Sequence, residues 1–132
     1  MPTGNRMVRA LVVDDHRDVA ESLARLLQSM GCAATFVVHP SKAIDAAAAL
    51  DAEIVFLDIG MPEIDGYHLA RLFRQEYGET ILLVAVTAYG TDEDRRRSRQ
   101  AGFDAHVHKP VDIPIIESML ATVLASRRGR AG

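Results

Sequence analysis

The sequence is short of cysteine, aromatic residues, net charge and long apolar runs. Its one cysteine, Cys32, has no partner in the chain for a disulfide, and an unpaired thiol is typical of a reducing compartment. The formal net charge is only -3, so no overall basic field would attract nucleic acid or an anionic membrane. No apolar run approaches the roughly 18 residues that span a bilayer, and the N-terminus lacks the apolar segment of a signal peptide. We therefore expect a cytoplasmic protein that binds neither nucleic acid nor a membrane.

The chain does contain enough apolar material for one hydrophobic core. It has 132 residues, of which 48% are hydrophobic, and this fits a single globular domain. No linker, internal repeat or low-complexity segment divides it. We expect one domain over residues 1–132, with a core at about 8–125 and flexible ends at 1–6 and 127–132.

Short apolar runs alternate with helical patterns along the whole chain. The runs rich in Val, Ile and Leu predict strands at 8–14, 33–38, 53–58, 80–87 and 105–108. The segments after them predict helices at 18–31, 40–50, 67–77, 92–102 and 113–126. Continuous apolar strands are buried on both faces by helices, which is typical of a parallel sheet. Right-handed crossovers then give a doubly wound α/β domain.

Polar residues stand at the carboxyl ends of four of these strands. Asp14 and Asp15 end the first strand, Asp58 the third and Thr87 the fourth, and Lys109 follows the fifth. Each has a purely structural alternative: a helix cap, a turn residue, a strand former or a solvated charge. Ligands of open parallel sheets bind beyond the carboxyl ends of the strands. Four independent structural roles would not explain why these polar residues all lie at the same edge of the sheet. We therefore interpret them as one site.

The residue types in this site favour a magnesium-assisted reaction of phosphate. Mg²⁺ takes a few carboxylate oxygens, keeps several waters and leaves room for phosphate oxygens. Zinc is less suited, because the five histidines are scattered without ligand spacing, and His106 and His108 are only an i, i+2 pair. Lys109 and the Thr87 hydroxyl suit phosphoryl oxygens. A carboxylate can itself accept a phosphoryl group as an acyl phosphate, and Asp58 is best placed for this.

Four motifs together resemble the receiver domains of two-component response regulators. They are "VVDD", "FLDIGMPEIDG", "AVTAYG" and "HKP", in this order and at these separations. The resemblance covers about Val8 to Ala125, nearly the whole chain. It implies a flavodoxin-like (βα)5 fold, a doubly wound parallel sheet of five strands in the order 2-1-3-4-5.

The resemblance also implies roles for the acidic residues. Asp58 would accept a phosphoryl group from a histidine kinase or a histidine phosphotransfer protein. Asp15 and Asp58 would bind Mg²⁺ through their side chains, and Asp14 would act mainly through bound water. The backbone carbonyl of Gly60 would be a further ligand.

Further expectations from the resemblance concern the phosphoryl group and the lysine. Thr87 and Lys109 would hold the phosphoryl oxygens, and the Lys109–Pro110 bond would be cis. Gly60 and Tyr89 occupy the two positions that influence the hydrolytic water in receivers. Because Gly60 has no side chain and Tyr89 is large, we expect slow self-dephosphorylation.

His106 is the main departure from the family pattern. Most receivers carry Tyr or Phe at this position, where the ring turns inward when the threonine moves toward the phosphoryl group. An imidazole is smaller and more polar, and its charge can change near physiological pH. Coupling between Thr87, His106 and the partner surface would then be weak or pH-dependent. Alternatively, His106 is an exposed residue on an edge strand and the signal travels elsewhere.

Two rival classes share parts of this pattern. An aspartyl-phosphate type, Mg²⁺-dependent phosphatase usually has an Asp-x-Asp motif on its first strand and a substrate-covering insertion, whereas Asp14 and Asp15 are adjacent here. A flavodoxin-like carrier needs a hydroxyl- or glycine-rich phosphate loop where this chain has "DDHRDVA". The receiver interpretation is therefore favoured over both.

As a receiver, the chain would catalyse only its own phosphorylation and dephosphorylation and would signal through protein contacts with an unknown downstream partner. The apolar stripe over 115–124 is wide for one buried face, so a weak homodimer stays open. The stretch 85–112 particularly resembles receivers attached to hybrid histidine kinases. Whether the chain is a stand-alone regulator or such a receiver also stays open.

Overall fold

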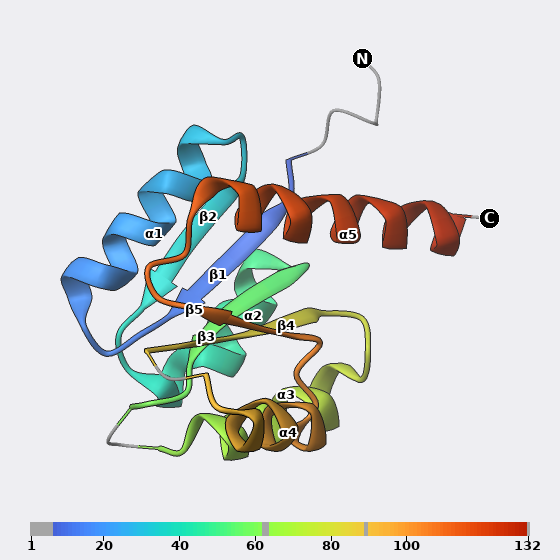
Figure 1. Ribbon diagram of the computed structural model, residues 1–132. Coiled ribbons are helices and arrows are strands. Elements are labelled where there is room, and N and C mark those ends of the chain that lie inside the picture. The colour runs from blue at the N-terminus through green and yellow to red at the C-terminus, as the bar shows by residue number, and fades with distance from the viewer. Residues whose placement is uncertain (1–6, 62–63, 89, 132) are drawn as a thin grey trace.

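A computed structural model describes residues 7–61, 64–88 and 90–131 of the chain. One parallel sheet runs through the molecule in the strand order β2-β1-β3-β4-β5, as the resemblance implied (Figure 1). Its strands are β1 (Arg9–Val13), β2 (Ala33–Val37), β3 (Ile54–Asp58), β4 (Leu82–Thr87) and β5 (Ala105–His108). The helices are α1 (Arg17–Ser29), α2 (Ala43–Leu50) with the preceding 3-10 turn η2 (Pro40–Lys42), α3 (Gly66–Tyr77), α4 (Asp92–Ala101) and α5 (Ile113–Ala131).

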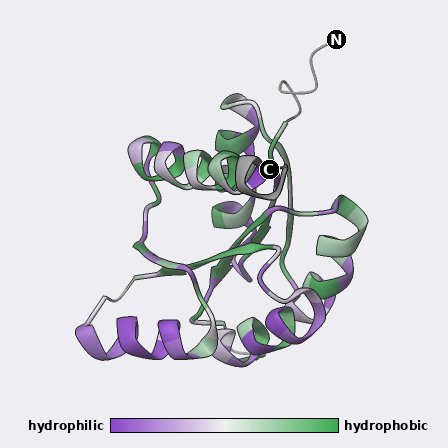
Figure 2. Ribbon diagram, turned by 90° about the vertical axis from the view of Figure 1, so that its right-hand side faces the viewer, coloured by the Kyte–Doolittle hydropathy of each residue, from purple (hydrophilic) through white to green (hydrophobic). Residues whose placement is uncertain are grey.

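Helices cover both faces of the sheet, which explains why its strands are continuously apolar. In β3, Val55 and Leu57 pack with α2 and α3, while Ile54 and Phe56 pack with α1 and α5. All the residues of β3 are buried. Figure 2 shows hydrophobic strands in the centre and, outside them, helices that carry both hydrophilic and hydrophobic residues. The predicted doubly wound α/β domain is therefore confirmed.

Helix α5 extends further than the sequence analysis expected. It runs to Ala131, whereas we expected the helix to end at 126 and a flexible end at 127–132. The helix therefore continues past its expected end, and Arg127 pairs with the buried carboxylate of Glu53, while the flexibility of 127–132 stays a prediction. Arginine is also a good helix former, so Arg127 can continue the helix. Within the described residues, none of the helices has both the length and the apolar character needed to cross a membrane.

Side-chain hydrogen bonds cap the first turns of α3 and α4, but not the first turn of α1. Asp65 caps α3 by accepting a hydrogen bond from the amide of Tyr67 at 3.0 Å. Thr91 and Asp94 form a reciprocal capping box at the start of α4. At α1 the N-cap residue is His16, and its side chain makes no capping hydrogen bond. Asp15 is thus not the cap of α1, which removes the structural alternative for that carboxylate.

Candidate functional site

The polar residues at the strand ends do meet at one edge of the sheet. Asp14 follows β1, Asp58 ends β3 and Thr87 ends β4, and these three residues are at most 5% exposed. Within the described chain, the buried polar or charged residues are Asp14, Glu53, Asp58, Thr87 and Ser98. Three of these five lie at this edge. Buried polar groups are costly without partners, so their concentration marks a built site.

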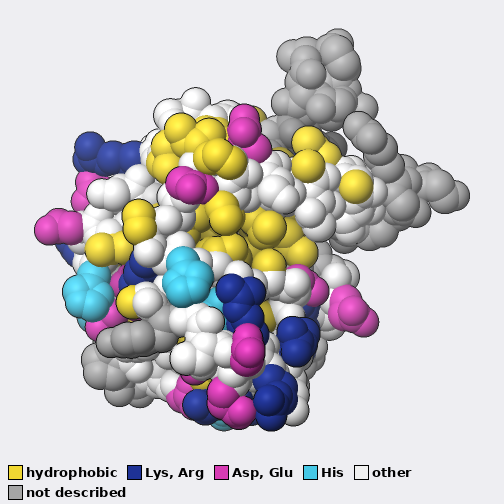
Figure 3. Space-filling view, viewed as in Figure 1, with side chains coloured by type: hydrophobic (Ala, Val, Ile, Leu, Met, Phe, Trp, Pro, Cys, Tyr) yellow, Lys and Arg dark blue, Asp and Glu magenta, His cyan; other side chains and the backbone are white. Residues whose placement is uncertain are grey.

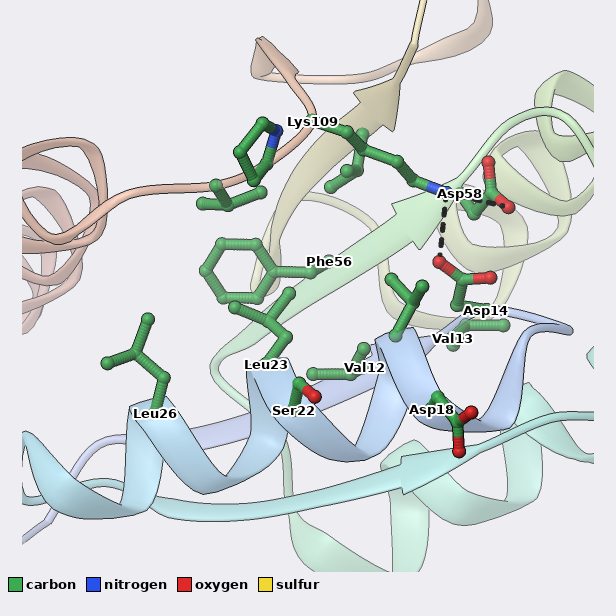
Figure 4. Close-up of a pocket in the computed structure, with 14 residues that line it drawn as sticks. Val12, Val13, Asp14, Asp18, Ser22, Leu23, Leu26, Phe56, Asp58 and Lys109 are labelled. Atoms are coloured by element: carbon green, nitrogen blue, oxygen red, sulfur yellow. Dashed lines mark ion pairs between the residues drawn. The ribbon is translucent and has the colours of Figure 1, made fainter.

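Lys109 joins the two buried carboxylates (Figure 4). Its Nζ lies 3.0 Å from Oδ2 of Asp14 and 3.4 Å from Oδ2 of Asp58. Burial lowers the pKa of Lys109, but the hydrogen bond to Asp14 and the negative charge of Asp58 outweigh this and leave the pKa above its usual value. The lysine is therefore held as a cation beside Asp58.

The surroundings of Asp58 disfavour the ionised form of its carboxyl group. Burial raises its pKa and the charge of Asp14 adds to this, although the Gly60 amide and Lys109 act in the opposite direction. The Gly60 amide donates to Oδ1 of Asp58 at 2.9 Å. Negative charge on Asp58 is thus only partly compensated by the protein's own groups.

An acidic cluster next to Asp58 has the donor set of a divalent cation site. Asp14, Asp15, His16 and Asp58 offer ligand atoms that all lie within 4.8 Å of one another. Oδ1 of Asp15 is buried and accepts no hydrogen bond, which is costly for a carboxylate unless a cation meets it. The predicted ligands Asp14, Asp15 and Asp58 are therefore brought together, and they fit a hard dication such as Mg²⁺.

The structure locates some of the remaining predicted site residues but not all of them. Lys109–Pro110 is cis, so this prediction is confirmed. Gly60 lies beside Asp58, while the ligand role of its carbonyl stays a prediction. His106, in β5, is half-buried, and its Nδ1 lies 2.9 Å from Oγ of Ser98 on α4. Tyr89 lies outside the described residues.

Two residues near these positions were missed by the sequence reasoning. His16 was set aside because the histidines are scattered, yet it directly follows Asp14 and Asp15 in the sequence and its ring reaches both. Ser98 gave no signal, since a single serine in the arginine-rich helix 92–102 looks solvated. In the structure Ser98 is buried and bonded to His106.

A mainly apolar cleft of about 580 Å³ adjoins the acidic edge (Figure 4). Its walls come from α1, with Leu23 and Leu26, and from the segment after β5, with Val111. Asp58 and Lys109 lie at one end of the cleft. Figure 3 shows further hydrophobic side chains gathered in a hollow between α5 and β5. A protein surface that reaches Asp58 can thus pack against apolar side chains.

The fold and the acidic edge together define a doubly wound α/β domain with a candidate cation site beside a buried aspartate. The chain matches the response regulator receiver domain family over residues 10–121, and it belongs to that family. It is 34% identical over 103 residues to an uncharacterized 14.6 kDa protein in the sodA1 3' region of Leptolyngbya boryana, covering 77% of this chain and 79% of that protein.

Longer relatives and solved structures agree with this assignment. The chain is 35% identical to the sensor histidine kinase RcsC of Escherichia coli over 89% of its own length but only 12% of the kinase. The structure of a CheY-like receiver domain from Methylobacillus flagellatus is similar with a TM-score of 0.77 at 28% identity, covering 89% of this chain and 99% of that one. The similarity to RcsC is therefore limited to a small part of that kinase.

Proposed function

We propose that this chain is the phosphoacceptor of a two-component phosphorelay, taking a phosphoryl group onto Asp58 from a histidine kinase or a histidine phosphotransfer protein. The observation that carries the proposal is the position of Asp58, buried at the end of β3 with Lys109 Nζ at 3.4 Å and the acidic cluster beside it. A structural ion pair would account for Lys109, but it would not explain why the further carboxylates of Asp14 and Asp15 lie beside Asp58.

The reaction follows from these contacts. An oxygen of Asp58 attacks the phosphorus of a phosphohistidine, so that an O–P bond forms, the N–P bond breaks and the imidazole leaves. Lys109 balances charge on the transferring group, and the Thr87 hydroxyl donates a hydrogen bond to it. Asp14, Asp15 and Asp58, with the Gly60 carbonyl, would hold Mg²⁺, which supplies further charge neutralisation when bound.

The substrate of this chemistry is the protein's own carboxylate. The chain would therefore catalyse only its own phosphorylation and dephosphorylation, and its signal would pass through protein contacts. The apolar cleft beside Asp58 gives a phosphodonor protein a surface to pack on. Ile113, Ile115 and Leu124 of α5 are exposed, which supports a contact with a downstream protein or a weak homodimer.

Incubation with Mg²⁺ and acetyl phosphate, followed by intact-mass measurement, tests the proposal. We expect the parent to gain one labile phosphoryl group and Asp58→Asn to gain none. Asp18→Asn is the matched control, because Asp18 is an exposed carboxylate on the nearby α1. Equal labelling of Asp58→Asn and the parent would refute the assignment. Continuous hydrolysis of the donor without retained label would instead favour the phosphatase alternative.

A further inference from the structure

The imidazole of His16 lies against the acidic cluster. Its Nδ1 is 3.4 Å from Oδ1 of Asp14 and 3.4 Å from Oδ1 of Asp15. His16 occupies the N-cap position of α1, yet its side chain does not cap the helix. Its backbone amide instead donates to Oδ1 of Asp14 at 3.0 Å, which fixes the residue beside the carboxylates. The ring thus presents a nitrogen to the place where a cation would be bound.

We propose that His16 is a nitrogen ligand of this cation site and that the site binds divalent transition metals such as Ni²⁺ and Co²⁺ more tightly than Mg²⁺. The inference rests on the proposed function only in placing a dication between Asp14, Asp15 and Asp58. It goes further in assigning a fourth side chain and a different metal preference.

The separation of the donor atoms fits two neighbouring ligands of one ion. Imidazole nitrogens and carboxylate oxygens bind such ions at about 2.0–2.2 Å, so two of them lie roughly 3.0–3.5 Å apart at octahedral or tetrahedral angles. The distances of 3.4 Å from His16 Nδ1 to Asp14 and Asp15 fall in this range. The buried Oδ1 of Asp15, which accepts no hydrogen bond, then gains a cation as its partner.

The preference for transition metals follows from the donor type. Mg²⁺ is bound by oxygen and keeps its waters, so an imidazole adds little to its affinity. Imidazole suits Ni, Cu, Zn and Fe, and affinity for a mixed nitrogen and oxygen site rises from Mn²⁺ through Co²⁺ to Ni²⁺ and Cu²⁺. An all-carboxylate site would follow the same order, but without a nitrogen donor the difference in affinity between these ions and Mg²⁺ would be smaller.

The competing interpretation is that His16 is a counter-ion of the two carboxylates. A positively charged ring there would repel any dication, so its removal would strengthen the binding of Mg²⁺ and Ni²⁺ alike. A ligand role predicts the opposite for Ni²⁺. Removal of the His16 ring therefore lowers the Ni²⁺ affinity if His16 is a ligand and raises it if His16 is a counter-ion.

Calorimetric titration of the unphosphorylated full chain with MgCl2 and NiCl2 distinguishes them, using the parent, His16→Ala and His68→Ala. His68 is an exposed histidine on α3 and controls for binding by surface imidazoles. We expect the parent to bind Ni²⁺ more tightly than Mg²⁺. His16→Ala should lose roughly tenfold or more in Ni²⁺ affinity with little change for Mg²⁺, and His68→Ala should match the parent.

The visible absorption of bound Co²⁺ gives a second readout. A nitrogen ligand changes the cobalt spectrum, so the spectra of the parent and His16→Ala should differ, and those of the parent and His68→Ala should coincide. Unchanged or increased Ni²⁺ affinity in His16→Ala, or an equal loss in His68→Ala, overturns the inference. In those cases Mg²⁺ binding by the parent still supports the proposed function. A parent that binds neither ion contradicts both.

Discussion

Glu53 and Arg127 form an ion pair across 74 residues of sequence, at the edge of the sheet opposite the Asp58 site. The Glu53 side chain is buried, and it also accepts a hydrogen bond from the backbone amide of Arg9 at 3.2 Å. Arg127 reaches the carbonyl of Met7 at 3.2 Å. The pair therefore ties the last turns of α5 to the beginnings of β1 and β3.

We predict that breaking this pair destabilises the fold far more than breaking a surface pair. Arg127→Gln leaves a buried carboxylate without its main partner and should lower the free energy of unfolding by about 2 kcal/mol. Arg25→Gln is the matched control, since Arg25 pairs with Glu21 on the exposed surface of α1 and should cost about 0.5 kcal/mol or less. Urea unfolding at neutral pH measures both. Equal losses would contradict a structural role for the Glu53–Arg127 pair.

The same pair predicts a pH dependence of stability. Burial raises the pKa of Glu53, but the hydrogen bonds from Arg127 and Arg9 outweigh it and leave this pKa below its usual value. The ionised carboxylate therefore stabilises the fold above the unfolded pKa of about 4.3, and this contribution is lost as the pH falls through the lower folded value. In acid, the stability of the parent should fall more steeply than that of Glu53→Gln. Parallel curves would exclude this contribution.

Asp58 should have the opposite effect on the pH dependence of stability, because its pKa is raised and not lowered. Because burial and the charge of Asp14 raise its pKa, the folded state holds the proton more tightly than the unfolded state, and stability is lost as the pH rises from the unfolded value through the folded one. Without added metal, Asp58→Asn should be more stable than the parent at neutral pH, by on the order of 1 kcal/mol. The difference should disappear in acid. A less stable variant at neutral pH would show that the contact with Lys109 outweighs burial.

Glu53 and Asp58 are both buried acids, yet only Asp58 was recognised from the sequence as a site residue. Asp14, Asp58, Thr87 and Lys109 were found because the carboxyl ends of parallel strands meet at one edge, whatever the side-chain packing. The sheet itself followed from its continuous apolar strands. From the sequence, Glu53 was only the first residue of the predicted strand 53–58. Its ion pair could not be predicted, because the position of Arg127 depends on the direction and length of α5. Such pairings are set by packing and leave no periodic signal.

Gly60 provides a prediction about the lifetime of the phosphoryl group. A Cβ at this position would lie 3.5 Å from Oδ1 of Asp58, an ordinary contact, so a side chain can be added without displacing the acceptor. Gly60→Asn should shorten the phosphoryl lifetime severalfold, because its amide can orient the hydrolytic water. Gly60→Ala is the control that adds bulk without a polar group.

Loss of label after removal of the acetyl phosphate gives the rate for each Gly60 variant. If Gly60→Asn and Gly60→Ala lose phosphate as slowly as the parent, the missing side chain is not the reason for slow hydrolysis. Tyr89→Glu tests the companion expectation from the sequence, that a large side chain at 89 shields the phosphoryl group.

The Nδ1 of His106 is held 2.9 Å from Oγ of the buried Ser98. This contact joins β5 to α4. His106 is thus not simply an exposed edge residue. To turn inward it must exchange the contact with Ser98 for one in the core, which is unfavourable for a polar ring that leaves its hydrogen-bond partner.

We therefore expect the contact between His106 and Ser98 to limit the response of α4 to phosphorylation. Phosphorylation-induced shifts of the backbone amides of 92–101, measured by NMR, report that response. His106→Tyr should enlarge the response, because a larger and less polar ring packs more favourably in the core, and Ser98→Ala should enlarge it by releasing the ring. His106→Ala removes the ring and should abolish the coupling. If the parent and all three variants respond equally, His106 is no switch and the signal leaves Thr87 by another route.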